Sequence, residues 1–89
     1  MIARHLIVDG RVQGVFYRDW TVDTARTLAL TGWVRNLPDG KVEAHIEGEP
    51  QAIERMIEAM RSGPPRAAPS RIEQEEVPTC GLESFDRRG

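Results

Sequence analysis

The sequence predicts a single α+β domain over residues 1–89, a β-α-β-β-α-β sandwich with two helices on one face of an antiparallel sheet. Its length of 89 residues matches one domain. Apolar residues alternate strictly with polar ones in KVEAHIEG, as in a half-buried strand. Further along the chain, apolar residues recur at helical spacing. A layered arrangement of helices and strands buries both kinds of apolar face.

The first half of the chain predicts a strand, a helix and a second strand. Residues 2–10 are rich in branched apolar side chains, which favours a strand. Residues 18–30 contain neither Gly nor Pro and have apolar residues at helical spacing, which predicts a helix. Gly32 ends that helix, and residues 33–36 form a short strand. The segment LPDG that follows is typical of a turn.

The turn leads into the strand with the clearest alternation, residues 41–48. We expect one face of this strand to contact the core and the other to face solvent. The inward residues are Val42, Ala44 and Ile46, and the outward ones are Lys41, Glu43, His45 and Glu47.

The second helix begins at Pro50, because proline suits a first helical position. Its apolar stripe consists of Ile53, Met56, Ile57 and Met60. Gly63 and the two prolines after it end the helix. We expect a loop over residues 66–70, a weak strand over 71–77, a short edge strand over 82–87, and a frayed terminal RRG.

Composition excludes several classes of protein. A single cysteine, Cys80, allows no intramolecular disulfide and favours a reducing, cytoplasmic setting in which it is an inert thiol. The chain has no CxxC or HExxH motif, and its histidines, His5 and His45, are far apart in sequence and expected on solvent-facing strand positions. These features argue against zinc, so we expect no metal and no cofactor.

The net charge of −2 argues against binding of nucleic acid, which usually needs a basic surplus. No apolar run approaches the length that a membrane span needs. Nothing in the sequence requires more than a monomer.

The segment GRVQGVFYR, residues 10–18, is the strongest candidate for a functional site. The first two predicted strands run in the same direction, so this loop and Asn36 meet at one edge of the sheet. A glycine-bracketed loop before a helix can direct several N–H groups at an anion, and the helix N-terminus adds to their field. Arg18 at the helix start offers a planar fork that can grip two phosphate oxygens.

These segments carry a resemblance to a known family. GRVQGVFYR followed by GWVRNLPDGKVEAHIEG, with GPP at residues 63–65, resembles the acylphosphatases, which hydrolyse the carboxyl–phosphate bond of acyl phosphates. The resemblance implies a ferredoxin-like fold and no metal. It also implies that Arg18 binds the phosphoryl oxygens and that Asn36 positions the attacking water. The amides of the cradle would be those of Gln13, Gly14, Val15, Phe16, Tyr17 and Arg18.

The expected chemistry is simple, because an acyl phosphate already has a good leaving group. Holding the substrate in line and stabilising charge on its equatorial oxygens are the main tasks. Neither motif supplies a general base, so we expect a phosphoryl oxygen of the substrate to accept the proton of the water. Inorganic phosphate or sulfate should inhibit by occupying the same cradle.

Two other functions remain open, an RNA-binding module of the same fold and a noncatalytic phosphate-binding or accessory module. The acidic balance and the lack of an RNP1 pattern oppose the first. Taken alone, Arg18 could be a surface ion-pair partner of Asp19 or Asp23, and Asn36 a turn former. The aromatic residues are expected in the core or in the walls of the site: Phe16, Tyr17, Trp20 and Trp33.

Overall fold

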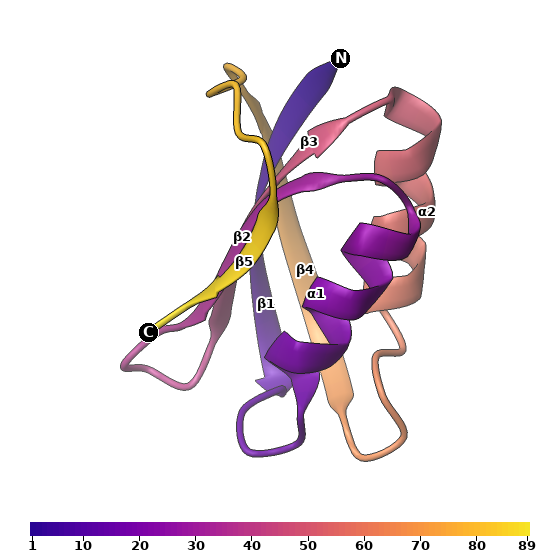
Figure 1. Ribbon diagram of the computed structural model, residues 1–89. Coiled ribbons are helices and arrows are strands. Elements are labelled where there is room, and N and C mark those ends of the chain that lie inside the picture. The colour runs from indigo at the N-terminus through magenta and orange to yellow at the C-terminus, as the bar shows by residue number, and fades with distance from the viewer.

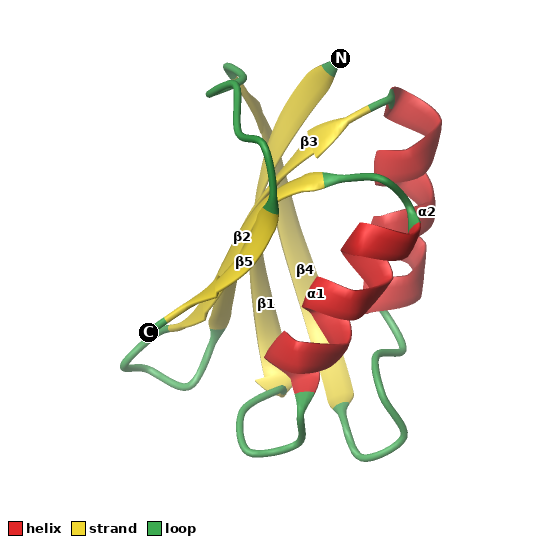
Figure 2. Ribbon diagram, in the orientation of Figure 1, coloured by secondary structure: helices red, strands yellow, loops and turns green.

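The computed structural model describes residues 1–89 and contains a sheet of five strands with two helices (Figure 1). The elements follow one another as β1 (Ile2–Arg11), α1 (Tyr17–Thr27), β2 (Thr31–Asn36), β3 (Val42–Gly48), α2 (Pro50–Met60), β4 (Ala68–Val77) and β5 (Phe85–Arg88). Both helices lie on the same face of the sheet (Figure 2), which confirms the predicted two-layer α+β sandwich.

The strand order is β4-β1-β3-β2-β5. Strands β1 and β3, β1 and β4, and β2 and β3 pair in antiparallel fashion. Strand β5, in contrast, pairs with β2 in parallel. The sheet is therefore mixed rather than purely antiparallel, because the segment after β4 crosses to the far edge of the sheet before β5 begins.

The core lies between the sheet and the helices and has the predicted members. On β3 the three inward residues are fully buried, and on α2 the whole apolar stripe is buried. The inward face predicted for each of these two elements is confirmed, because it is the face that contacts the core. The buried residues from these two elements are Val42, Ala44, Ile46, Ile53, Met56, Ile57 and Met60.

Helix α1 ends at Thr27, three residues before the expected end. Ala29 adopts a left-handed conformation with φ of 57°. The N–H of Ala29 donates to the carbonyl of Arg26, and that of Leu30 donates to the carbonyl of Ala25. This pair of hydrogen bonds is a Schellman motif. Glycine usually occupies the left-handed position, so an alanine there gave no sign of the helix end.

Gly32 was expected to stop the helix but lies inside β2, which begins at Thr31. A Cβ atom at this position would lie 1.8 Å from the carbonyl oxygen of His45 on β3. Glycine is therefore required here because β2 and β3 approach too closely for a Cβ atom. Its φ of 142° is also a conformation that residues with a side chain rarely adopt.

The C-terminal third is more regular than expected. Residues 68–70 belong to β4 rather than to a loop, and Pro69 pairs with Gly10 next to a register shift in β1. Proline is tolerated there because β4 is an edge strand. The terminal arginines are not frayed either, since Arg87 and Arg88 pair with β2 as part of β5.

The sheet face away from the helices is not uniformly open to solvent. His45 and Glu47 on β3 were expected to point outward into water, but they are only 7% and 2% exposed. The backbone N–H of Cys80 donates to the Glu47 carboxylate at 2.6 Å. The segment between β4 and β5 thus covers this part of the sheet, a contact that alternation along β3 alone could not reveal.

Candidate active site

The candidate site lies where β1 and β2 end. Both strands pair in antiparallel fashion with β3, so they run in the same direction, as predicted. Val8 of β1 and Asn36 of β2 both pair with Val42 of β3. The loop from β1 to α1 and the turn after β2 therefore extend from the same end of the sheet, where the strands β1 and β2 terminate; this end lies at the bottom of Figure 1.

The loop between β1 and α1 has a conformation suited to an anion. Gly14 has φ of 73°, and Phe16 has φ of 64°. No protein acceptor takes the N–H groups of residues 13–19, and Trp20 is the first residue here whose N–H donates, to Phe16 at 3.0 Å. Free amides before and within a first helical turn form a region of positive potential.

Arg18 stands in the first turn of α1. Together with the loop it lines a cavity of about 260 Å³, whose walls are Val12, Gly14, Phe16, Tyr17, Arg18, Asp19 and Arg87. The Arg18 Nη1 donates to the backbone oxygen of Gly89 at 3.0 Å. Asp19 does not pair with Arg18, because its carboxylate accepts from Arg87 at 2.7 Å. The Arg18 guanidinium is therefore not neutralised by its acidic neighbour.

Asn36 is the last residue of β2, and its side chain is partly buried. Its Oδ1 atom is buried and has no hydrogen-bond donor within the protein. An orphaned acceptor of this kind is unfavourable unless a water or a ligand satisfies it. Asn36 does not line the cavity beside Arg18. The structure thus gathers Arg18 and the loop around one cavity and places Asn36 at the same sheet edge, outside its lining.

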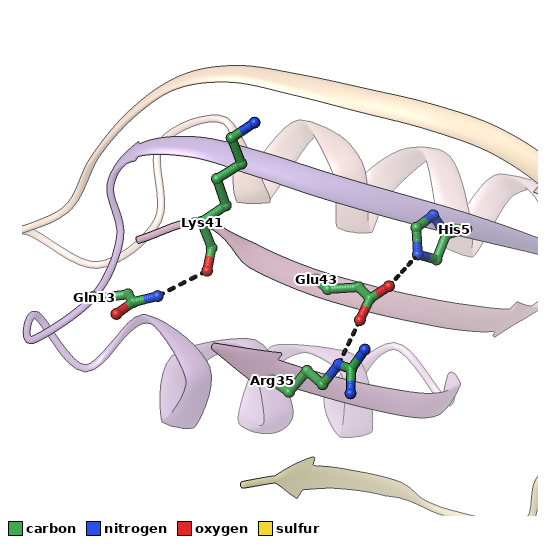
Figure 3. A network of polar contacts seen from close by, with 5 residues as sticks. All are labelled: His5, Gln13, Arg35, Lys41 and Glu43. Atoms are coloured by element: carbon green, nitrogen blue, oxygen red, sulfur yellow. Dashed lines mark hydrogen bonds and ion pairs between the residues drawn. The ribbon is translucent and has the colours of Figure 1, made fainter. Parts of the chain in front are cut away.

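Gln13 has a role that the sequence analysis missed. Its Nε2 donates to the carbonyl oxygens of both Leu37 and Lys41, each at 2.8 Å; Figure 3 shows the contact with Lys41. The loop is thereby tied to both ends of the turn that follows Asn36. The sequence predicts a role only for the backbone amide of Gln13, although its side chain carries two N–H donors that can bind carbonyl groups across the site.

Tyr17, the first residue of α1, anchors the start of this helix to the end of α2. Its ring is 1% exposed, and its hydroxyl donates to the carbonyl of Met60 at 2.7 Å. Burial raises the pKa of Tyr17 well above its usual value, so the hydroxyl stays neutral.

The other aromatic residues expected in the walls of the site differ in position. Phe16 is 70% exposed at the rim of the cavity. Of the predicted aromatic walls, Trp33 lies elsewhere, because its ring stacks on that of His45.

A second polar network lies on the helix-free face, along β3. The Glu43 carboxylate contacts His5 on β1 and Arg35 on β2 (Figure 3). Burial raises the pKa of Glu43, but the hydrogen bonds and charges of His5 and Arg35 outweigh it, so its pKa lies below the ordinary value. These contacts join three strands and involve neither Arg18 nor Asn36. His5 is thus partly buried and hydrogen-bonded to Glu43 rather than free in solvent.

Comparison with known proteins identifies the family. The acylphosphatase family model matches residues 4–86. An acylphosphatase of Trichormus variabilis is 49% identical over 86 residues, 97% of this chain and 85% of that protein. The crystal structure of acylphosphatase from Bacillus subtilis superposes with a TM-score of 0.98 at 36% identity, and the match covers 100% of both chains.

A third comparison concerns a larger protein. The crystal structure of HypF from T. kodakarensis matches all of this chain with a TM-score of 0.88 and 36% identity, but the match covers 12% of HypF.

The family model and the two acylphosphatases show that the chain belongs to the acylphosphatase family, and its fold is the ferredoxin-like α+β sandwich of that family. It is a hydrolase of acyl phosphates, the activity of this family. Neither helix is long and apolar enough to cross a membrane.

Proposed function

We propose that the loop between β1 and α1 binds the phosphoryl group and that Arg18 and Asn36 carry out the hydrolysis. The observation that carries this proposal is the set of N–H groups in residues 13–19 that have no acceptor in the protein. A phosphoryl group supplies several strong acceptors and negative charge at once. The cradle consists of the amides of Gln13, Gly14, Val15, Phe16, Tyr17 and Arg18.

Arg18 binds two phosphoryl oxygens through its guanidinium fork. Its side chain lines the same cavity as Gly14, so the fork and the loop amides contact one anion from two sides. Together they stabilise charge on the equatorial oxygens as the transition state forms. By analogy with oxyanion holes, each such donor contributes about 10²–10³ in rate.

Asn36 orients the attacking water. Its orphaned Oδ1 accepts a hydrogen bond from the water, and its amide N–H₂ can donate a hydrogen bond to the same water. The water oxygen forms a bond to phosphorus while the bond from phosphorus to the carboxylate oxygen breaks, and the carboxylate leaves with the electron pair. The proton of the water passes to a phosphoryl oxygen, because Asn36 cannot hold it.

No acid is required for the leaving group, since a carboxylate is stable as an anion near neutral pH. The protein therefore contributes position and charge rather than proton transfer. No metal or cofactor has a part in this mechanism. Phosphate or sulfate competes with substrate for the amides, and the chain acts as a monomer in the cytoplasm, in keeping with its one free cysteine.

Hydrolysis of benzoyl phosphate tests the proposal against the alternative of a noncatalytic phosphate-binding or accessory module. The match to a small part of HypF makes that alternative concrete, because there the same fold is one part of a much longer chain. Our mechanism predicts release of benzoate and phosphate with saturation kinetics and competitive inhibition by phosphate. Binding of phosphate without turnover would support the accessory module and contradict the catalytic roles of Arg18 and Asn36.

A further inference from the structure

A second cluster of reactive side chains lies far from the cradle. His45 and Glu47 of β3 and Cys80 of the segment after β4 offer one imidazole nitrogen, one carboxylate oxygen and one sulfur within 4.8 Å of one another. Glu47 pairs with Ala3 and Thr31, which lie near the starts of β1 and β2. The cluster is thus at the end of the sheet opposite the loop of Arg18.

The three side chains differ in access to solvent. His45 and Glu47 are buried, whereas Cys80 is exposed. The His45 Nε2 lies 2.6 Å from the Glu47 Oε2, and the same oxygen accepts from the N–H of Cys80 at 2.6 Å. The imidazole is held further by stacking on Trp33. Two ligands are therefore fixed by packing, and the third lies at the surface, where an ion can enter.

We propose that His45, Glu47 and Cys80 form a binding site for a zinc-like divalent transition metal. Nitrogen, oxygen and thiolate sulfur are the ligands that zinc takes in proteins, at about 2.0–2.3 Å. Ligand atoms around such a tetrahedral ion lie about 3.3–3.8 Å apart, so the observed cluster needs only small side-chain shifts. Water fills the fourth position. A hard ion such as magnesium would not select a thiolate.

Binding exchanges protons for the ion. The ion takes the place of the hydrogen bond between His45 Nε2 and Glu47, the imidazole keeps its one proton on Nδ1, and Cys80 releases its thiol proton to solvent as it binds the ion as a thiolate. The backbone N–H of Cys80 keeps its hydrogen bond to Glu47 and continues to orient the carboxylate.

The site would be structural rather than catalytic. It joins β3 to the segment that leads into β5, and β5 carries Arg87, whose side chain lines the cavity beside Arg18. A metal here would stabilise the attachment of that segment without contacting substrate. No short metal-binding motif is present in the sequence, because these three residues come together only through the crossing of the chain from β4 to β5.

Titration of metal-free protein with Co²⁺ tests the site. Cobalt bound to a thiolate gives a sulfur-to-metal charge-transfer band in the near ultraviolet, and because Cys80 is the single cysteine, this band reports on one residue. We expect the band to saturate at one equivalent, to disappear on addition of Zn²⁺, and to be absent from Cys80→Ser. Zn²⁺ should also raise the thermal unfolding midpoint of the unaltered protein but not that of Cys80→Ser.

The buried ligands are tested by His45→Gln and Glu47→Gln, with His5→Gln as the control, because His5 pairs with Glu43 and has no thiol beside it. His45→Gln and Glu47→Gln should each weaken cobalt binding at least about tenfold. Loss of a residue that only hydrogen-bonds to a metal ligand already costs that much, and these two residues are ligands themselves. His5→Gln should bind as the unaltered protein does. Absence of the band in the unaltered protein, or an equal band in the folded His45→Gln variant, would overturn the proposal.

Discussion

The side-chain amide of Gln13 donates a hydrogen bond of 2.8 Å to the carbonyl oxygen of Lys41 at the end of the sheet where β1 and β2 end. A second bond from the same nitrogen reaches Leu37, the neighbour of Asn36. One side chain therefore sets the distance between the loop that precedes α1 and the turn beside Asn36. The proposed mechanism uses both segments and therefore depends on such a link, because small misplacements of reacting groups cost much of the rate.

Replacing Gln13 should damage kcat more than stability. Gln13→Ala removes both hydrogen bonds but leaves every backbone amide of the loop in place. We expect kcat to fall about tenfold or more through misplacement of the reacting groups. Loss of the bonds themselves should lower the free energy of unfolding by only about 1–3 kcal/mol. Steady-state kinetics and urea unfolding measure the two effects.

Gln13→Glu is the sharper control, since it keeps the shape of the side chain but replaces the donor by an acceptor. It should be at least as inactive as Gln13→Ala. A folded Gln13→Glu enzyme with full kcat would show that the loop and the turn are positioned without this contact.

Arg18→Lys should lose most activity although it keeps the charge. An ammonium cannot make the two parallel bonds of a guanidinium, so we expect a fall of about 10²–10³ in kcat/KM. Arg87→Lys is the matched control, because Arg87 lines the same cavity but is paired with Asp19. It should stay within about threefold of the unaltered enzyme, since exposed ion pairs contribute little. Equal losses in the two variants would contradict the special role of Arg18.

Asn36→Ala should abolish turnover while phosphate binding stays nearly normal. The change removes the contacts to water but leaves the loop amides and Arg18 intact. The interaction that is lost therefore stabilises mainly the transition state, so kcat falls while phosphate binding does not. Asn36→Asp keeps the shape but places a carboxylate beside the substrate anion. It should be folded, nearly inactive and weaker in phosphate binding than Asn36→Ala. Kinetics together with calorimetric titration of phosphate separate these outcomes; normal turnover of the folded Asp variant would exclude Asn36 from the mechanism.

Removal of metal should leave turnover unchanged. The proposed cradle supplies its positive field from N–H groups and one guanidinium, and the His45, Glu47 and Cys80 cluster lies at the other end of the sheet. Enzyme treated with a strong chelator and assayed with benzoyl phosphate should keep its kcat, and so should Cys80→Ser. Loss of turnover that a divalent metal restores would refute the metal-free mechanism, whether or not the cluster binds an ion.

Tyr17→Phe should destabilise the fold without changing the chemistry. The variant leaves the buried carbonyl of Met60 without the hydroxyl that donates to it at 2.7 Å. We expect the free energy of unfolding to fall by about 1–3 kcal/mol, the cost of an unsatisfied buried acceptor. Urea unfolding measures the change. An unfolding free energy equal to that of the unaltered protein would mean that water satisfies Met60.

The parts of the fold that follow from local patterns could be predicted from the sequence. The stripe on α2 and the alternation on β3 each identify one buried face, and the parallel directions of β1 and β2 follow from the helix between them. The loop of Arg18 and the position of Asn36 follow from the same topology. These predictions needed only neighbours along the chain.

What the sequence did not reveal depends on partners distant along the chain. Glu47 is buried because Cys80 comes to lie against it, and β5 pairs in parallel because the chain crosses the sheet after β4. Neither residue type nor spacing signals those contacts. Ala29 is a different case, since a left-handed alanine is uncommon and only the hydrogen bonds around it show that the helix has ended.

The position of β1 in the middle of the sheet has a consequence for how the chain folds. The first strand pairs with β3 on one side and with β4 on the other, and Ala3 lies opposite Val77. Pairings between residues so far apart in sequence give a high contact order, which slows folding relative to helical domains of the same size. During synthesis, one edge of β1 stays unpaired until β4, Ala68–Val77, has left the ribosome. We therefore expect the loop that follows β1, the proposed phosphate site, to become ordered late.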